Sequence, residues 1–357
     1  MMQASKPKVL VTGSSGFIGT AVIRRLAPDY ELVGFDVQEG QGIAGADFIQ
    51  VDISENESVL AGLQEMRNRH GDRLASVVHL AAYYDFSGEP STQYENITVR
   101  GTQRLLQGLQ RNFHVEQFLF SSTMLVHAPA EPGQKINEHW PLAPKWDYPE
   151  SKVRTEELLR AQHGDIPIVL ARIAGIYDDH CHSIPLANQI QRIRERWMTS
   201  QVYPGDLSRG QAFLHLDDLV EAIAHMVERR RELPSETTVL LGEPETLSYG
   251  ELQQEFGRLI HNEEWATRHV SKTVAKTGAW LQDHLPFAED PFIKPFMVDL
   301  ADDHYELDIR RAQTLLDWEP QHSLRATLPV MIAAMKADPL GWYEANKLTP
   351  PAELVEH

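Results

Sequence analysis

Short apolar runs alternate with amphipathic stretches through the first half of the chain. Mainly apolar runs predict strands at residues 8–11, 32–35, 48–51, 77–80, 117–120 and 168–171. Between them, apolar residues that recur every three or four positions predict helices, of which the clearest are 17–26, 98–109 and 151–161. Strands that alternate with helices are joined by right-handed crossovers, so this pattern predicts a parallel sheet.

Beyond Arg172 the alternation becomes irregular. Pro, Gly, His and Trp are scattered through 176–210 and 235–300, while 213–228 predicts a strand that runs into a helix capped by Asp217 or Asp218. We therefore expect an α/β fold, a doubly wound parallel sheet with a smaller, discontinuous C-terminal substrate lobe. The expected division is a nucleotide-binding domain at 1–175 and 211–234, a lobe at 176–210 and 235–342, and a loosely held tail at 343–357.

Composition excludes several classes of protein. The 357 residues carry a net charge of −18, which disfavours nucleic acid as a partner, and the basic run 229–231 is typical of a helix C-terminus. The single cysteine, Cys181, cannot form an internal disulfide and is consistent with a reducing compartment. No apolar run is long enough to span a membrane and no secretory leader is recognisable, so we expect a cytoplasmic protein.

A glycine-rich turn follows the first predicted strand. Gly13 permits a tight turn, Gly16 lets the backbone approach a ligand, and Gly19 lets the helix pack closely on the strand. The spacing is looser than the commonest dinucleotide fingerprint, but a strand precedes it and a helix follows. Exposed amides at the start of that helix favour a pyrophosphate, so the turn indicates a Rossmann nucleotide-binding fold.

Asp36 ends the second predicted strand. Its carboxylate can accept hydrogen bonds from both hydroxyls of the adenosine ribose, and it would repel a 2′-phosphate. No Arg or Lys follows in residues 37–40. The sequence therefore predicts NAD rather than NADP.

Tyr148 and Lys152 are four residues apart, which places both on one face of a helix. A free phenol has a pKa of roughly 10 and is a weak base at neutral pH. We expect the Lys152 ammonium, together with the positive nicotinamide ring, to lower the pKa of Tyr148. Tyr148 then accepts the proton of a substrate hydroxyl while the hydride moves to the cofactor.

Three hydroxyl residues end the strand upstream of this pair. Ser121, Ser122 and Thr123 lie where ligands of such sheets bind, and a hydroxyl there can stabilise the charge that develops on a substrate oxygen. Packing at the end of the strand is the alternative role of Ser121 and Ser122. We predict Thr123, Tyr148 and Lys152 as the catalytic residues.

These motifs together resemble the extended short-chain dehydrogenase/reductase family, the NAD-dependent epimerase/dehydratase group. The resemblance rests on the segments 12–19, 52–53, 79–82, 101–102, 121–123, 213–219 and 315–320 and on Asn96, Tyr148, Lys152 and Arg172. It implies that Asp52 and Ile53 flank the adenine, that Ala81 and Ala82 line the cofactor cleft, and that Lys152 also holds the nicotinamide ribose. The resemblance further implies a homodimer formed through the helices that begin near Asn96 and Ser151. The complete predicted cofactor-binding set is Gly13, Ser15, Gly16, Phe17, Ile18, Gly19, Asp36, Asp52, Ile53, Leu80, Ala81, Ala82, Asn96, Ser121, Tyr148 and Lys152.

Departures from the family pattern narrow the expected chemistry. Met124 and Leu125 stand where the sugar-nucleotide dehydratases have an acidic pair, so water elimination is not expected. Gly175 and Gln211 replace an Asn and an Arg that are usual in sugar-nucleotide epimerases, although Arg209 is close by in the sequence. The segment 172–177 looks more like the steroid-type dehydrogenases of the same superfamily.

The sequence thus predicts an NAD-dependent oxidoreductase that transfers a hydride at a secondary alcohol or ketone carbon of a small-molecule substrate. Two alternatives remain open: epimerisation of a sugar nucleotide without net consumption of NAD, and an NAD-sensing protein without turnover.

The segment 180–182, His-Cys-His, suggests a metal site, but adjacent ligands rarely fit one tetrahedral ion and we expect no metal.

Overall fold

A seven-stranded parallel sheet forms the centre of the computed structural model, which describes residues 6–40, 45–85, 89–273 and 295–355. The strand order is β12-β8-β7-β5-β1-β2-β3. The strands are β1 Lys8–Thr12, β2 Glu31–Asp36, β3 Ala46–Gln50, β5 Ser76–His79, β7 Phe118–Thr123, β8 Ile168–Ile173 and β12 Glu236–Leu241. From β1 the chain first adds β2 and β3 on one side and then β5, β7, β8 and β12 on the other. In such folds the ligand cleft lies at this switch point, at the carboxyl ends of the strands.

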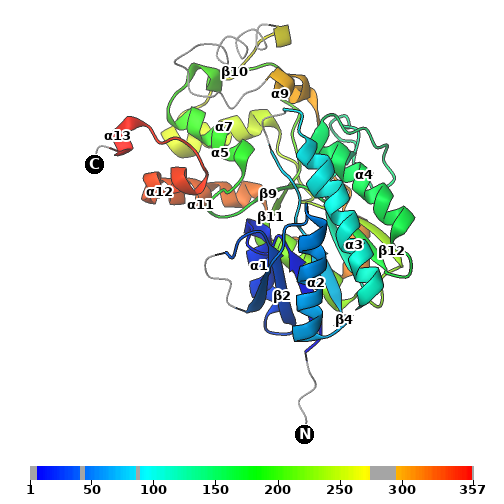
Figure 1. The fold of residues 1–357 in the computed structure, drawn as a ribbon. Coiled ribbons are helices and arrows are strands. Elements are labelled where there is room, and N and C mark those ends of the chain that lie inside the picture. Colours follow the sequence, from blue (N-terminus) through cyan, green and yellow to red (C-terminus); the bar gives the residue numbers. More distant parts are fainter. Residues whose placement is uncertain (1–5, 41–44, 86–88, 274–294, 356–357) are drawn as a thin grey trace.

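Helices cover both faces of this sheet (Figure 1). On one face, α1 (Phe17–Leu26), α6 (Leu216–Glu228) and α10 (Arg310–Leu316) share a buried apolar cluster with the strands. On the other face, α2 (Asn56–His70), α3 (Arg100–Asn112) and α4 (Asp147–Gln162) contribute to a second cluster. A π-helical turn, Tyr94–Val99, leads into α3. The predicted doubly wound α/β sheet is confirmed.

A third apolar cluster holds the smaller lobe together, which lies at the top of Figure 1. It is formed mainly by α5 (Ile184–Arg194), α7 (Tyr249–His261), α11 (Leu324–Ala337) and α12 (Pro339–Ala345). Two short parallel strands, β9 (Gly175–Tyr177) and β11 (Phe213–His215), connect the sheet to this lobe. The lobe also contains β10 (Val202–Tyr203), which pairs with β13 (Arg268–His269), and α9 (Pro295–Asp299). The chain ends in α13 (Ala352–Val355).

Three boundaries differ from the sequence expectations. Residues 236–241, which were assigned to the lobe, form the sheet strand β12 because they pair along their whole length with β8. Residue 343 does not begin a loose tail, since Tyr343 in α12 is fully buried in the lobe cluster. Helix α6 is capped by the side chain of His215, which accepts the amide of Asp217, because the helix begins one residue before the expected caps.

Candidate active site

The glycine turn joins β1 to α1 at the switch point of the sheet. Gly13 has a φ of +68°, and a Cβ atom there would lie 2.9 Å from the backbone nitrogen of Ala81 on the neighbouring strand. At Gly19 a Cβ would lie 2.1 Å from the carbonyl oxygen of Gly13. Both positions therefore admit only glycine without backbone movement. Gly16 is exposed and caps α1 without a side-chain hydrogen bond, so the first amides of the helix remain accessible to an anion.

Asp36 lies beside this turn. Its Oδ2 accepts the amide of Ser15 at 2.9 Å, and its Oδ1 accepts the amide of Val37 at 2.7 Å. The hydroxyl of Ser15 donates to the carbonyl of Gln38 at 2.6 Å, which ties the turn to the end of β2. The carboxylate is thus oriented at the rim of the cleft and keeps lone pairs for ribose hydroxyls. The turn and this carboxylate fit an NAD molecule whose pyrophosphate lies on α1.

The other predicted cofactor residues fall into two groups. Leu80, Ala81 and Ala82 follow β5 directly opposite the glycine turn, where the amide of Ala81 donates to the hydroxyl of Thr12 at 3.2 Å. Phe17 and Ile18 open α1, with Phe17 exposed and Ile18 packed on the core. The structure therefore brings these residues to the same cleft as Asp36.

Asp52, Ile53 and Asn96 are engaged by other parts of the protein. Asp52 accepts the amide of Ser54 at 2.8 Å, and Ile53 is buried against Gly101. The amide oxygen of Asn96 accepts a hydrogen bond from Arg104 at 3.1 Å. Their proposed contacts with the cofactor remain predictions that rest on the family resemblance.

Tyr148, Thr123 and Lys152 meet where β7 and α4 converge. Helix α4 begins at Asp147 rather than near Ser151, so Tyr148 lies in its first turn. Tyr148 forms a side-chain hydrogen bond with Thr123, whose oxygen also accepts the amide of Leu125 at 3.3 Å. Thr123 can therefore donate its proton to the phenol oxygen or to a substrate oxygen.

The pKa of Tyr148 differs from the sequence expectation. Burial raises the pKa of Tyr148 to about 12, although the hydrogen bond with Thr123 opposes this rise. The ammonium of Lys152 donates to the backbone carbonyl of Ser121 at 2.6 Å and lies 5.7 Å from the centroid of the Tyr148 ring. Lys152 is itself almost fully buried, which lowers its pKa to about 7. The lowering of the tyrosine pKa by Lys152 together with the positive nicotinamide ring stays a prediction.

A buried ion pair below these groups was not anticipated from the sequence. Glu156, one turn beyond Lys152, accepts two hydrogen bonds from Arg172 on β8, at 3.0 and 2.6 Å. It also accepts the hydroxyl of Ser122 at 2.6 Å. Ser122 thus packs at the end of the strand, which was the alternative to a role in catalysis. The hydroxyl of Ser121 donates to the carbonyl of His79 at 3.1 Å. The four-residue spacing from Lys152 to Glu156 was the signal that could have identified this anchor.

His79 lies between two threonines. Its ring nitrogens lie 2.6 Å from the hydroxyl of Thr12 and 2.9 Å from that of Thr102. Thr102 donates its own proton to the carbonyl of Thr98, so it accepts from Nε2, and Nδ1 of His79 accepts from Thr12. Complete burial and the nearby Lys152 lower the pKa of His79 to about 3. His79 therefore fixes the end of β5 rather than transferring a proton.

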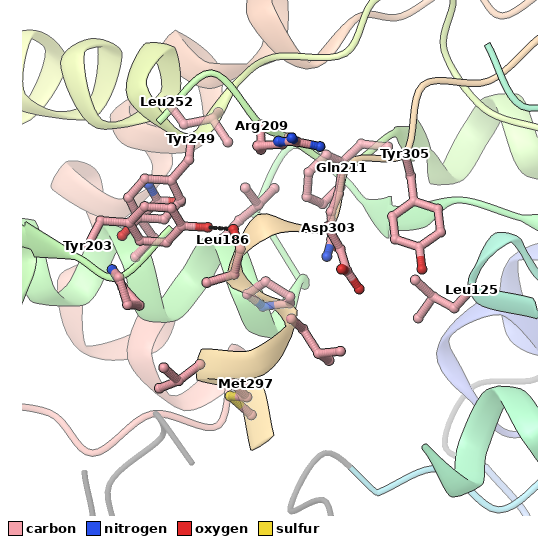
Figure 2. A pocket seen from close by; sticks show the side chains of 18 of the residues that line it. Leu125, Leu186, Tyr203, Arg209, Gln211, Tyr249, Leu252, Met297, Asp303 and Tyr305 are labelled. Atoms are coloured by element: carbon pink, nitrogen blue, oxygen red, sulfur yellow. Dashed lines mark hydrogen bonds between the residues drawn. The ribbon is translucent and has the colours of Figure 1, made fainter. Parts of the chain in front are cut away.

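A cavity of about 250 Å³ lies between the catalytic end of the sheet and the lobe. Figure 2 shows the stacked rings of Tyr203 and Tyr249 on one side of it and Leu125 and Tyr305 on the other. Trp146, which also lines the cavity, has its ring 5.3 Å from that of Tyr148. The cavity therefore adjoins the predicted catalytic residues. The sequence also carries an apolar series at 280–297, which predicts either small-lobe core or an apolar substrate wall; its members 280–292 lie outside the described residues, and Met297 lines the cavity.

The His-Cys-His segment does not converge on a common point. Cys181 is buried, and His182 pairs with Asp178 at 2.6 Å. Within the described part of the chain, His215, Asp217 and His322 do place potential ligand atoms within 4.8 Å of one another. The rings of His215 and His322 stack in nearly parallel planes at 4.0 Å, however, so their nitrogen lone pairs run side by side rather than toward one ion.

The fold and this site define a nucleotide-dependent oxidoreductase of the Rossmann type. The model of the NAD dependent epimerase/dehydratase family matches residues 9–242. The chain belongs to this family, and it is an enzyme of the extended short-chain dehydrogenase/reductase type with NAD as its cofactor. The sequence predictions of family, cofactor and class of enzyme are thereby confirmed.

Curated relatives have diverse reactions. UDP-glucose 4-epimerase of Streptomyces lividans is 29% identical over 248 residues, covering 62% of this chain and 72% of that protein. dTDP-D-glucose 4,6-dehydratase of Mus musculus is 26% identical over 232 residues, covering 60% of this chain and 63% of that protein. The match to the mouse protein thus spans less than two thirds of its length.

Solved structures share the whole fold. A dTDP-glucose 4,6-dehydratase from Bacillus anthracis in complex with NAD superposes with a TM-score of 0.71 at 18% identity, covering 95% of this chain and 99% of that one. UDP-glucuronic acid 4-epimerase from Bacillus cereus, in complex with UDP-glucuronic acid and NAD, gives a TM-score of 0.68 at 21% identity, covering 92% of this chain and 99% of that one.

Among the described residues, no helix combines the length and apolar character that a transmembrane span requires.

Proposed function

We propose that this enzyme transfers a hydride between NAD and a secondary alcohol or ketone carbon, with Tyr148, Lys152 and Thr123 as its catalytic residues. The observation that carries the proposal is the side-chain hydrogen bond between Thr123 and Tyr148, beside the cavity that Leu125 and Trp146 line. NAD, when bound, supplies the hydride acceptor or donor. Tyr148 moves the proton at the substrate oxygen, and Thr123 stabilises the charge on that oxygen.

Lys152 contributes to the site in two ways. Its contact with the Ser121 carbonyl fixes α4 against the end of β7, and the family resemblance implies that it also holds the nicotinamide ribose. Because burial lowers its pKa to about 7, Lys152 can share a proton with the site near neutral pH.

A substrate screen tests the reaction. Secondary alcohols and sugar nucleotides are offered with NAD, and separately with NADP, while the absorbance of the reduced cofactor is followed. We expect turnover with NAD that disappears in Tyr148→Phe while NAD still binds. Unchanged turnover in Tyr148→Phe would refute the catalytic assignment.

Epimerisation of a sugar nucleotide is the second candidate, because relatives such as the S. lividans protein are named as UDP-glucose 4-epimerase. In that reaction the hydride returns to the substrate and NAD is not consumed. Product with inverted configuration, and no net accumulation of NADH, would favour this candidate over a dehydrogenase. An NAD sensor without turnover is the third, and any substrate-dependent formation of NADH excludes it.

A homodimer in the cytoplasm completes the proposal. Helices α3 and α4 lie side by side along one flank of the sheet (Figure 1), and the family resemblance implies that two copies pair through these helices. Sedimentation should therefore give twice the chain mass of 40.5 kDa, and a mass of 40.5 kDa would contradict the dimer. Cys181 is the single cysteine of the sequence and cannot form an internal disulfide, which is consistent with a reducing compartment.

A further inference from the structure

One wall of the cavity is formed by α5, which presents two polar side chains one helical turn apart. Gln189 and Arg192 both line the cavity, and they are only 5% and 8% exposed. Most of the remaining lining is apolar or aromatic, as Figure 2 shows for Leu186, Leu252 and the Tyr203–Tyr249 stack. Two buried polar groups in such surroundings require partners, because an unsatisfied polar group in an apolar environment is costly.

The partners of these two side chains are incomplete. Arg192 donates from Nε to the carbonyl of Asn188 at 3.3 Å, and no carboxylate in the described part of the chain lies within ion-pair distance of its guanidinium. The side-chain nitrogen of Gln189 is buried and has no hydrogen-bond partner among the described residues. The helix therefore presents to the cavity a guanidinium without a counter-charge and an amide donor without an acceptor among the described residues.

The other cations of the cavity are already neutralised. Arg209 donates to Glu131 at 2.7 Å, and Lys145 pairs with Asp303. Arg172, the second strongly buried arginine near the site, is paired with Glu156. Arg192 is thus the cavity cation for which an anion from outside the protein would supply the missing charge.

We propose that Arg192, supported by Gln189, binds an oxyanion group of the substrate, a carboxylate or a phosphate, while the apolar walls hold the rest of the molecule. A guanidinium offers a planar set of donors that matches either oxyanion in a bidentate manner. The cavity leads to Trp146 and Leu125, which are two residues from Tyr148 and Thr123 respectively. The identification of this oxyanion as part of the substrate rests on the proposed function, whereas its binding by Arg192 does not.

Binding to the NAD-saturated enzyme tests the proposal without turnover. Calorimetry compares uridine diphosphate as the phosphate probe, phenylacetate as the carboxylate probe and phenylacetamide as the neutral analogue. We expect at least one oxyanion probe to bind, and to bind at least tenfold more weakly to Arg192→Gln. Arg196→Gln, an exposed arginine paired with Glu263, is the matched control and should bind as the wild type does.

The two oxyanion probes, uridine diphosphate and phenylacetate, distinguish which kind of molecule supplies the anionic group. Weakened binding of uridine diphosphate indicates a nucleotide substrate, and weakened binding of phenylacetate indicates an organic acid. If neither probe binds the wild type, or if both bind Arg192→Gln with unchanged affinity, the proposal is overturned. Loss of phenylacetamide binding to the same extent as phenylacetate also overturns it, because the effect then concerns shape rather than charge.

Thermal unfolding of the ligand-free enzyme provides a second readout. An unpaired buried charge destabilises the protein that contains it, so Arg192→Met should unfold at a higher temperature than the wild type. A lower unfolding temperature would show that Arg192 has a structural role and would contradict the proposal. If Arg192 binds an oxyanion but no alcohol reduces NAD, the proposed reaction fails while this inference stands.

Discussion

Burial acts in opposite directions on the two ionisable groups of the catalytic centre. It raises the pKa of Tyr148 to about 12 and lowers that of Lys152 to about 7, since in each case the charged form loses solvation. The spacing of these residues could be predicted from the sequence. Their protonation could not, because it depends on how deeply the fold buries both groups and on the charge of Glu156 near Lys152.

At the same scale, Asp36 should determine the choice of cofactor. Replacement by Ala removes the acceptor for the ribose hydroxyls and the acceptor of the Ser15 amide. We expect the dissociation constant for NAD to rise about tenfold, corresponding to roughly 1.4 kcal/mol, and the discrimination against NADP to shrink.

Calorimetric titration with each nucleotide measures both effects. Glu39→Ala, which removes a neighbouring exposed carboxylate, serves as the control and should change neither affinity. Equal affinities for NADP in the wild type and in Asp36→Ala would show that this carboxylate does not exclude the 2′-phosphate.

At the scale of the elements, α4 is fixed to the sheet by a buried ion pair. Glu156 on α4 accepts Arg172 from β8 and Ser122 from β7, so one carboxylate joins the helix that holds Tyr148 to the two strands beneath it. Local pattern predicted the helix itself but placed its start near Ser151, because the apolar periodicity begins there. The helix begins at Asp147, and the local signal for this earlier start is Pro149, which suits the first turn of a helix.

Removing the buried arginine that pairs with Glu156 should therefore lower the free energy of unfolding far more than removing the partly exposed one. Arg172→Met leaves Glu156 charged and buried, and we expect a loss of about 3 to 5 kcal/mol in the free energy of unfolding. Arg160→Met removes a partly exposed arginine that contacts the same carboxylate, and we expect a loss below about 1 kcal/mol. Denaturant unfolding compares the two variants, and equal losses would contradict the importance assigned to burial.

At the scale of the whole molecule, the lobe is assembled from segments far apart in the sequence. The sheet could be predicted because each βα unit carries its own pattern, but β12 was missed because its membership depends on pairing with β8. The lobe cluster likewise combines α5, α7, α11 and α12, whose contacts are non-local. Glu243, just beyond β12, links these parts: it accepts the hydroxyl of Tyr177 on β9 and the amide of Leu324 at the start of α11, both at 2.7 Å.

The buried carboxyl group of Glu243 should make the free energy of unfolding depend on pH. Burial raises the pKa of Glu243 to about 7 from its ordinary value of 4.5, so the folded state retains a proton that the unfolded state releases between these values. The contribution of Glu243 is therefore present at low pH and is lost as the pH rises toward 7, by roughly 3 kcal/mol.

Unfolding of Glu243→Gln and of the wild type is compared between pH 4.5 and 7.5, a window set by the shifted pKa of Glu243. We expect the stability of the variant relative to the wild type to increase with pH across this window. The exposed neighbour provides the control, and Glu245→Gln should show no such trend. A constant difference between Glu243→Gln and the wild type would contradict the raised pKa.

The central claim is that Tyr148 moves the proton as the hydride leaves the substrate carbon. A single-turnover experiment tests it most directly, with saturating NAD and a substrate from the screen that carries deuterium at the carbinol carbon. The account predicts a burst of reduced cofactor in the wild type that deuterium slows, and no burst in Tyr148→Phe although its affinity for NAD is unchanged. A burst of wild-type rate in Tyr148→Phe would contradict the account.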